Sequence, residues 1–265
     1  MAKSFHGRGC RFGAGFLTVG RGYTLDVNLH KVRSPVVSSE PSSAAAVAEL
    51  DPSIIGPDVY APQDDSWLLC QAVADAGVAV DARVLDMCTG SGAVGLEAAR
   101  LGARSVTAYD ISPAAVECAA RQARSENLDV DVRLGSFDDA AELSAFDVVL
   151  CNPPYVPAEA VPVEIGLERA WNAGPDGRIV LDRLCESAAD LVQKGGVLML
   201  VQSEFADPDK SLQMLSDNGF RVREVVRSTI AFGPVMDAQA RWLERTGRLE
   251  IGRRTEELVV IRADR

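Results

Sequence analysis

The chain of 265 residues has the composition of a globular protein, with 47% hydrophobic and 25% charged residues. No apolar stretch reaches the roughly 18–20 residues of a membrane span, and glycines and arginines interrupt the apolar core that a signal peptide would need, so we expect a cytoplasmic protein. The net charge of −11 and the pI of 4.7 argue against duplex nucleic acid as the main partner, because such binding requires many phosphates to be neutralised by Lys and Arg.

The cysteines and histidines show no metal-binding pattern. The six cysteines include no C-x-x-C pair, and there are only two histidines, so we expect no metal site. Cys88 and Cys151 lie inside apolar, strand-like runs, where a thiol packs as a small hydrophobic group. We therefore expect reduced, structural cysteines.

Residues 1–50 differ in composition from the rest of the chain. Gly and Arg are frequent in the first part, and the polar run SPVVSSEPSSAAA follows. Such a segment offers little apolar surface for burial, so we predict a short, irregular and poorly ordered extension. We expect residues 51–265 to form one domain, and residues 1–50 to be largely dispensable for its fold.

From residue 51 onward, strand-like runs alternate with helical patterns, and Gly102, Gly195 and Gly219 are expected to end helices. Regular alternation of this kind predicts an α/β fold with a doubly wound, mostly parallel sheet. The two final strands bring the expected number to seven. The predicted strands are 83–87, 105–109, 131–134, 146–151, 196–202, 221–226 and 257–262. The predicted helices are 92–101, 113–125, 178–193, 208–218 and 237–245.

A glycine-rich turn follows the strand at 83–87. Gly90, Gly92 and Gly95 match G-x-G-x-x-G, which by itself fits a dinucleotide site, another nucleoside cofactor or a tight turn without a ligand. Asp110 lies 20 residues after Gly90 at the end of the next strand, where its carboxylate can accept both ribose hydroxyls. Asp86 lies in the strand itself and can hold a cationic amino group, indirectly or through water, whereas it would repel a pyrophosphate. The spacing therefore favours S-adenosylmethionine over NAD.

The segment Asn152-Pro153-Pro154-Tyr155 directly follows the strand at 146–151. An isolated tetrapeptide of this type is most simply a turn, but here it follows the cofactor-type glycine loop by roughly 60 residues. An amide or aromatic amine nitrogen is a poor nucleophile because its lone pair is delocalised. The Asn152 side-chain oxygen and the Pro153 carbonyl can each accept one N–H, which orients the nitrogen and offsets its developing charge. We expect Tyr155 to stack its ring on the flat acceptor group.

With these motifs, the chain from about residue 56 to its end resembles the HemK-type protein N5-glutamine methyltransferases, which have the Rossmann-like class I methyltransferase fold. The resemblance rests on VYAPQDDSWLL at residues 59–69, LDMCTGSG, CNPPYVP and AWNAGPDG, with EELVV near the end. The first block is similar to V-Y-x-P-x-E-D-[ST] of the smaller branch, with Asp64 in place of the usual glutamate. The first 50 residues show no periodicity like that of the helical domain with which the larger branch recognises release factors.

The resemblance implies S-adenosylmethionine as cofactor. It implies that Asp65 and Ser66 lie near the carboxylate end of the cofactor, and that Ser136 or Phe137 lies beside the adenine. We expect Asn152, Pro153, Pro154 and Tyr155 to act on the acceptor. The cofactor contacts that we expect are Asp65, Ser66, Asp86, Thr89, Gly90, Gly92, Asp110, Ile111, Ser136, Phe137 and Asn152.

The preferred acceptor is a glutamine side-chain amide in the GGQ-type loop of a peptide chain release factor. The alternatives are a nucleobase of RNA or DNA and a small molecule, and a non-enzymatic cofactor-binding scaffold is a fourth possibility. The scaffold is disfavoured because both motifs are intact. A nucleobase acceptor predicts a basic groove beside Tyr155, yet the segment 157–168 carries Glu159, Glu164 and Glu168.

Overall fold

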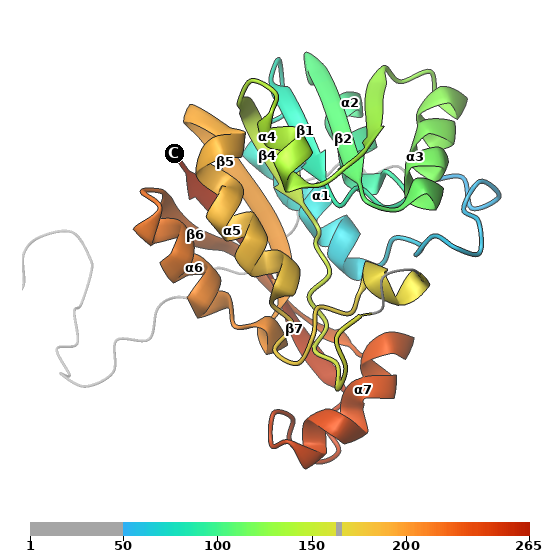
Figure 1. Ribbon diagram of the computed structural model, residues 1–265, viewed down its shortest axis with the longest axis vertical. Helices are drawn as coiled ribbons and strands as arrows, with labels where there is room; N and C mark the ends of the chain where they lie inside the picture. The colour runs from blue at the N-terminus through green and yellow to red at the C-terminus, as the bar shows by residue number, and fades with distance from the viewer. Residues whose placement is uncertain (1–49, 163–165) are drawn as a thin grey trace, which may run out of the picture. The chain divides into compact units, whose positions relative to one another are not determined.

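The computed structural model describes residues 50–162 and 166–265, and the predicted extension at 1–50 lies outside this part of the chain except for its last residue. A seven-stranded sheet with the strand order β3-β2-β1-β4-β5-β7-β6 forms the centre (Figure 1). The strands from β1 to β5 are parallel, and β7 runs antiparallel to both β5 and β6. The predicted doubly wound, mostly parallel sheet is confirmed. The strands are β1 (Arg83–Met87), β2 (Ser105–Asp110), β3 (Val130–Leu134), β4 (Phe146–Cys151), β5 (Val192–Ser203), β6 (Arg221–Ala231) and β7 (Thr255–Asp264).

Helices cover both faces of this sheet, and α5 and α6 cross the near face in Figure 1. The α-helices are α1 (Asp64–Ala76), α2 (Ala93–Arg100), α3 (Pro113–Ser125), α4 (Phe137–Ala141), α5 (Ile179–Leu191), α6 (Pro208–Asp217) and α7 (Pro234–Arg245). Within the described residues, two short 3-10 helices, η1 (Leu167–Ala170) and η2 (Glu204–Ala206), lie in the connections.

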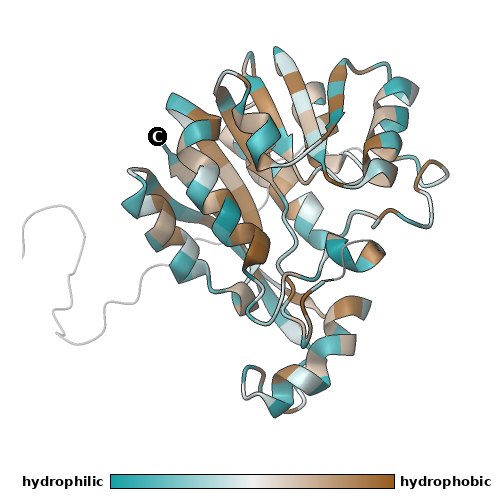
Figure 2. Ribbon diagram, viewed as in Figure 1, coloured by the Kyte–Doolittle hydropathy of each residue, from teal (hydrophilic) through white to brown (hydrophobic). Residues whose placement is uncertain are grey.

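The sheet separates two apolar cores because successive side chains along a strand point to opposite faces. Val84 and Leu150 pack against α1 and α2, whereas their neighbours Leu85 and Val149 pack against α5 on the other face. The central strands are buried on both faces, so their apolar runs are nearly continuous, as the hydropathy colouring shows (Figure 2).

Several element boundaries differ from the predictions. Helices α1 and α4 were not predicted, because α1 lies within the segment assigned to cofactor capping and α4 has only five residues. The predicted helix end at Gly195 is wrong: α5 already ends at Leu191, and Gly195, with φ of 82°, lies in β5, whose pairing with β4 is irregular there. Gly102 and Gly219 do follow helix ends, in the left-handed conformation that glycine adopts without strain.

Leu50 begins the described part of the chain and belongs to the core. It is 5% exposed and packs with Leu96 of α2 and Ala123 of α3. The buried side chain of Gln122 accepts a hydrogen bond from the backbone N–H of Asp51 and donates one to its carbonyl. Leu50 and Asp51 are therefore fixed to α2 and α3.

Candidate active site

A cavity of about 1350 Å³ lies at the carboxyl ends of β1, β2 and β4. In a doubly wound sheet this is the edge where ligands bind, beside the point at which the strand order reverses. Its walls come from the residues that follow these strands, from the segment leading into α1, and from the beginnings of α7 and β7. The volume exceeds that of a typical pocket for one small ligand, so it can hold a cofactor together with part of an acceptor.

The glycine loop between β1 and α2 forms one wall. Gly90 and Gly92 have φ values of 56° and 95°, a conformation that side chains rarely adopt. Asp86 is fully buried behind the loop, and one of its carboxyl oxygens accepts from Thr89 Oγ1 (2.6 Å) and from the Gly95 N–H (2.9 Å). A Cβ on Gly95 would lie 2.9 Å from that oxygen. Asp86 therefore braces the loop from within, in addition to lining the cavity.

Burial raises the pKa of Asp86 to about 7, because desolvation outweighs the two hydrogen bonds that favour the carboxylate. The neutral form of the carboxyl group is therefore more populated at neutral pH than it is in an exposed aspartate. A cationic group bound next to it would favour the charged form, which agrees with the predicted preference for an amino group.

Asp110 ends β2 and faces the glycine loop. Its Oδ2 accepts from the Gly90 N–H and its Oδ1 from the Ser112 N–H, both at 2.9 Å. Burial nevertheless raises its pKa. The next residue, Ile111, lines the cavity although it is 51% exposed, which offers an apolar surface beside the carboxylate.

The start of α4 forms the neighbouring wall. Ser136 is the N-cap of the helix, and Asp139 accepts from both its backbone N–H (2.7 Å) and its hydroxyl (2.8 Å). This capping box fixes the entry of the chain into α4. It thereby places the Phe137 ring, which is 8% exposed, against the cavity.

The NPPY segment after β4 is tied to the N-terminus of α1. The side-chain N–H of Asn152 donates to Ser66 Oγ at 3.1 Å, and the Tyr155 hydroxyl donates to Asp65 Oδ2 at 2.8 Å. The other Asp65 oxygen accepts from the backbone N–H and the hydroxyl of Ser66. Because the amide nitrogen of Asn152 is engaged, its Oδ1 remains as the acceptor for a substrate N–H.

Tyr155 is more buried than we expect for a ring that stacks on the acceptor group of the substrate. The residue is 8% exposed and packs in the core with Leu181 and Met236, and burial together with the nearby Asp65 carboxylate raises its pKa. Its hydroxyl, for which the sequence suggested no specific partner, positions Asp65.

The structure brings almost all predicted site residues to this one cavity. Asp65, Ser66, Asp86, Thr89, Gly90, Asp110, Ile111, Ser136, Phe137, Asn152, Pro153, Pro154 and Tyr155 all line it. Gly92 lies behind the wall, where a Cβ would come within 3.1 Å of both Ala119 of α3 and Leu96 of α2. Gly92 therefore allows close helix packing and is not among the lining residues.

Many of the lining residues were not predicted as site residues, among them Tyr60, Phe232 and Glu256. Tyr60 and Glu256 fall within blocks that carry the resemblance, but their spacing to the other motifs gives no sign of proximity. Glu256 is distant in sequence and reaches the site because β7 pairs with β5 beside β4.

Acidic side chains outnumber basic ones in the wall of the cavity. Among its described lining residues there are six carboxylates and two arginines, Arg169 and Arg183. The carboxylates belong to Asp58, Asp64, Asp65, Asp86, Asp110 and Glu256. A cationic or neutral ligand therefore suits this surface better than one that carries phosphates.

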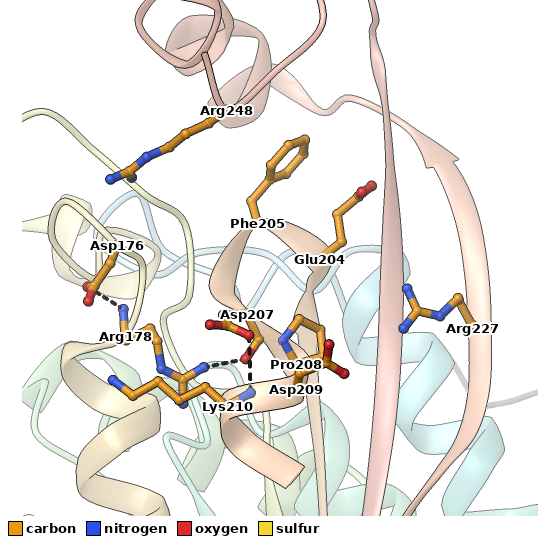
Figure 3. Close-up of a pocket in the computed structure, with 10 residues that line it drawn as sticks. All are labelled: Asp176, Arg178, Glu204, Phe205, Asp207, Pro208, Asp209, Lys210, Arg227 and Arg248. Atoms are coloured by element: carbon orange, nitrogen blue, oxygen red, sulfur yellow. Dashed lines mark hydrogen bonds between the residues drawn. The ribbon is translucent and has the colours of Figure 1, made fainter. Parts of the chain in front are cut away.

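A second hollow lies between η2, the start of α6 and Arg248 (Figure 3). Its wall includes Arg178, which is 2% exposed and donates to the Asp207 carbonyl (2.7 Å), to Ser211 Oγ (3.0 Å) and to Asp182 (2.7 Å). The Asp207 side chain in turn accepts from the backbone N–H of Lys210 (3.1 Å). These contacts fix the loops to α5 and α6, so we assign a structural role to the network.

In the part of the chain that the structure covers, no three Cys, His, Asp or Glu side chains are grouped as a metal site would require. Nor does any helix within residues 50–162 or 166–265 have the length and apolarity to cross a membrane.

Comparison with known proteins defines first the class and then the family. Residues 63–232, more than half of the chain, match the family "Methyltransferase small domain". The fold is similar to that of the Mtq2–Trm112 complex of E. cuniculi, with a TM-score of 0.53 and 24% identity over 78% of this chain and 99% of that chain. The protein is therefore an S-adenosylmethionine-dependent methyltransferase with the class I fold.

Two relatives specify the family. The chain is 31% identical to a Methanocaldococcus jannaschii protein assigned as a protein N5-glutamine methyltransferase, over 68% of this chain and 90% of the relative. It is 32% identical to the release factor glutamine methyltransferase of Moorella thermoacetica, over 67% of this chain and 62% of the relative. The chain belongs to the HemK-type protein N5-glutamine methyltransferase family.

Proposed function

We propose that the protein methylates the side-chain amide nitrogen of a glutamine in a protein substrate, and that this glutamine lies in the GGQ-type loop of a peptide chain release factor. The names of the relatives support a glutamine acceptor, and one of them is named for a release factor. A relative from Bordetella pertussis, 37% identical over 44% of this chain, is named for ribosomal protein uL3, which makes that protein the natural comparison in a test.

The observation that carries the proposal is the fixed orientation of Asn152. Its amide nitrogen donates to Ser66 Oγ at 3.1 Å, so its oxygen is the group presented to an acceptor. A primary amide has two N–H groups, which Asn152 Oδ1 and the Pro153 carbonyl can accept together. Both acceptors follow directly from β4, whose register with β1 and β5 holds them in place. They orient the nitrogen and offset the charge that develops on it during transfer.

The residues of the opposite wall suit S-adenosylmethionine. When bound, this cofactor supplies an electrophilic methyl group on a sulfonium centre. We propose that Asp110 holds the ribose hydroxyls, that Ile111 and Phe137 contact the adenine, and that the acidic surface around Asp86 favours the ammonium group. The positive-φ backbone at Gly90 supports this assignment, since no atom lies within 4 Å of the position where its Cβ would be.

The charge of the cavity favours a glutamine side chain over a nucleic acid as the methyl acceptor. Burial raises the pKa of Asp86 and Glu256 to about 7, but even with both neutral, four carboxylates outnumber the two arginines among the described lining residues. This disfavours a nucleic-acid acceptor with its phosphates. A neutral glutamine side chain faces no such repulsion.

The test is transfer of labelled methyl groups from S-adenosylmethionine to release factor, uL3, bulk tRNA and DNA in parallel, with mass mapping of the product. We expect label on a single glutamine of the release factor. Label on nucleic acid, or on a residue other than glutamine, would refute the proposal.

A further inference from the structure

The AWNAGPDG segment, residues 170–177, lies beside the chain that leaves the NPPY segment. Val156, the residue after Tyr155, forms a parallel β-bridge with Asn172. The Val156 N–H donates to the Trp171 carbonyl at 2.8 Å. Because the two bridge partners are paired, the residues that precede them, Tyr155 and Trp171, are also neighbours.

Asn172 fixes this arrangement from within its own segment. The residue is 1% exposed, and its side-chain nitrogen donates to the Ala160 carbonyl at 3.1 Å and to Glu168. Its side-chain oxygen accepts from the Gly174 N–H at 2.9 Å. These partners lie both before and after Trp171 in the chain, so the backbone of Trp171 is held next to the NPPY segment before any substrate binds.

The Trp171 side chain keeps accessible surface in the wall of the cavity. Of the six aromatic residues that line this wall within the described chain, Tyr60 and Trp171 are half-buried, and the others are at most 9% exposed. The Tyr60 ring is held through its hydroxyl, which accepts from Gln63 at 2.8 Å. No described residue accepts a hydrogen bond from the Trp171 indole, so its exposed surface has no fixed polar partner within this part of the chain.

The chemistry of an amide acceptor calls for a flat surface at this place. The two N–H groups of a primary amide lie in its plane and can reach Asn152 Oδ1 and the Pro153 carbonyl. The nitrogen lone pair is perpendicular to that plane, so one face of the amide must stay open for methyl transfer. A ring of the protein can therefore cover only the opposite face, and Tyr155 is too buried to do so.

We propose that the Trp171 indole is the surface on which the side-chain amide of the acceptor glutamine packs. The inference rests on the proposed function and gives Trp171 the stacking role that the sequence suggested for Tyr155. The packing orients the amide without occupying its N–H groups, and it suits a planar acceptor by shape.

The kinetic test compares Trp171→Phe with Trp171→Leu in the full chain, with S-adenosylmethionine and a synthetic peptide that carries one glutamine between glycines. Phenylalanine keeps a flat ring, so KM for the peptide should stay within about twofold of wild type. Leucine is apolar but has no flat face, and it should raise this KM by roughly three- to tenfold. Because the contact exists before transfer as well as during it, kcat should change less than KM, and calorimetry should show unchanged cofactor affinity.

Trp242→Leu is the matched control. Trp242 is also half-buried and packs against the same apolar core as Trp171, but it is not among the described residues that line the cavity. Thermal melts of both leucine variants report the stability that each loses, and Trp242→Leu should leave KM for the peptide unchanged. An unchanged KM in Trp171→Leu, equal increases in Trp171→Phe and Trp171→Leu, or the same increase in Trp242→Leu would overturn the inference.

Indole fluorescence follows binding of the same peptide without transfer, in the presence of S-adenosylhomocysteine. The peptide has no aromatic residue, so the signal comes from the three tryptophans of the protein. We expect a change in emission that Trp171→Phe removes and Trp242→Phe retains. Absence of a response in the wild type, or a response that persists in Trp171→Phe, would refute the contact. Failure of the wild type to methylate any glutamine would instead refute the proposed function, and the fluorescence titration decides the contact in either case.

Discussion

Replacement of Asn152 by alanine should abolish most turnover without unfolding the protein. Removal of one preorganised group at the reacting atom typically lowers the rate 10²–10³-fold, or about 2.7–4 kcal/mol. The effect on stability should be small, because Ser66 Oγ, which loses the Asn152 donor, keeps Asp65 as a partner at 3.3 Å. No buried polar group is therefore left unpaired.

Ser66→Ala tests the same arrangement from the other side. It removes the acceptor at 3.1 Å that fixes the Asn152 amide, and the loss of one such bond corresponds to about 0.5–1.5 kcal/mol, or roughly a two- to tenfold loss of kcat. Because Ser66 would act only through Asn152, the double variant Asn152→Ala/Ser66→Ala should be no slower than Asn152→Ala alone.

Single-turnover methyl transfer at saturating peptide, together with thermal melts and calorimetry of cofactor binding, measures these quantities. We expect Asn152→Ala to keep its melting temperature and to leave cofactor binding nearly intact. Normal turnover of this variant at saturating acceptor would refute the assignment of the NPPY segment to the amide nitrogen. Additive losses in the double variant would show that Ser66 contributes independently of Asn152.

Four further changes have defined outcomes. Asp110→Ala should weaken S-adenosylmethionine binding by about 1.5–3 kcal/mol in calorimetry, through loss of charge-assisted hydrogen bonds, and unchanged affinity would contradict the ribose role. Tyr155→Phe should lower turnover less than Tyr155→Ala, and it should raise KM for S-adenosylmethionine because Asp65, expected near the carboxylate end of the cofactor, loses its 2.8 Å partner; equal losses would show that the hydroxyl is the whole contribution. Since the folded protein raises the pKa of Glu256 from 4.5 to about 7, it binds more protons than the unfolded chain in this window, so stability should fall as pH rises from about 4.5 to 7. Denaturant titrations should show this fall reduced by up to ~3 kcal/mol in Glu256→Gln, and an identical pH dependence would refute the raised pKa. Leu50→Ala should cost about 2–3 kcal/mol of unfolding free energy, and a cost below 0.5 kcal/mol would show that this contact with α2 and α3 does not contribute to the core.

The sequence alone determined the seven strands, most of the helices and two of the walls of the site. Alternating periodicities predict the parallel sheet, because a strand buried on both faces is continuously apolar whereas a covering helix is amphipathic. The glycine loop, Asp110 and the NPPY segment each follow a strand directly. Parallel strands all end at the same edge, so local spacing is enough to place these residues together.

Tertiary structure decided what these residues contact. The sequence gives no distance between Tyr155 and Asp65, which are 90 positions apart, yet their hydrogen bond fixes α1 to the NPPY segment. Nor does the sequence show that Asp86 braces the glycine loop, because that role depends on the hydrogen bond from the Gly95 backbone N–H at 2.9 Å.

Glu256 shows most clearly which features of the site cannot be predicted from the sequence. Its neighbours in the sequence predict a strand, but its burial and its unpaired oxygen follow from the antiparallel pairing of β7 with β5 and from the packing of α1 against β5 and β7. The spacing of apolar residues shows which face of a helix or strand is apolar, because this spacing involves only residues that are close together in the sequence. Which polar groups meet inside a cavity depends on contacts between segments far apart in the chain, and only the tertiary structure determines those contacts.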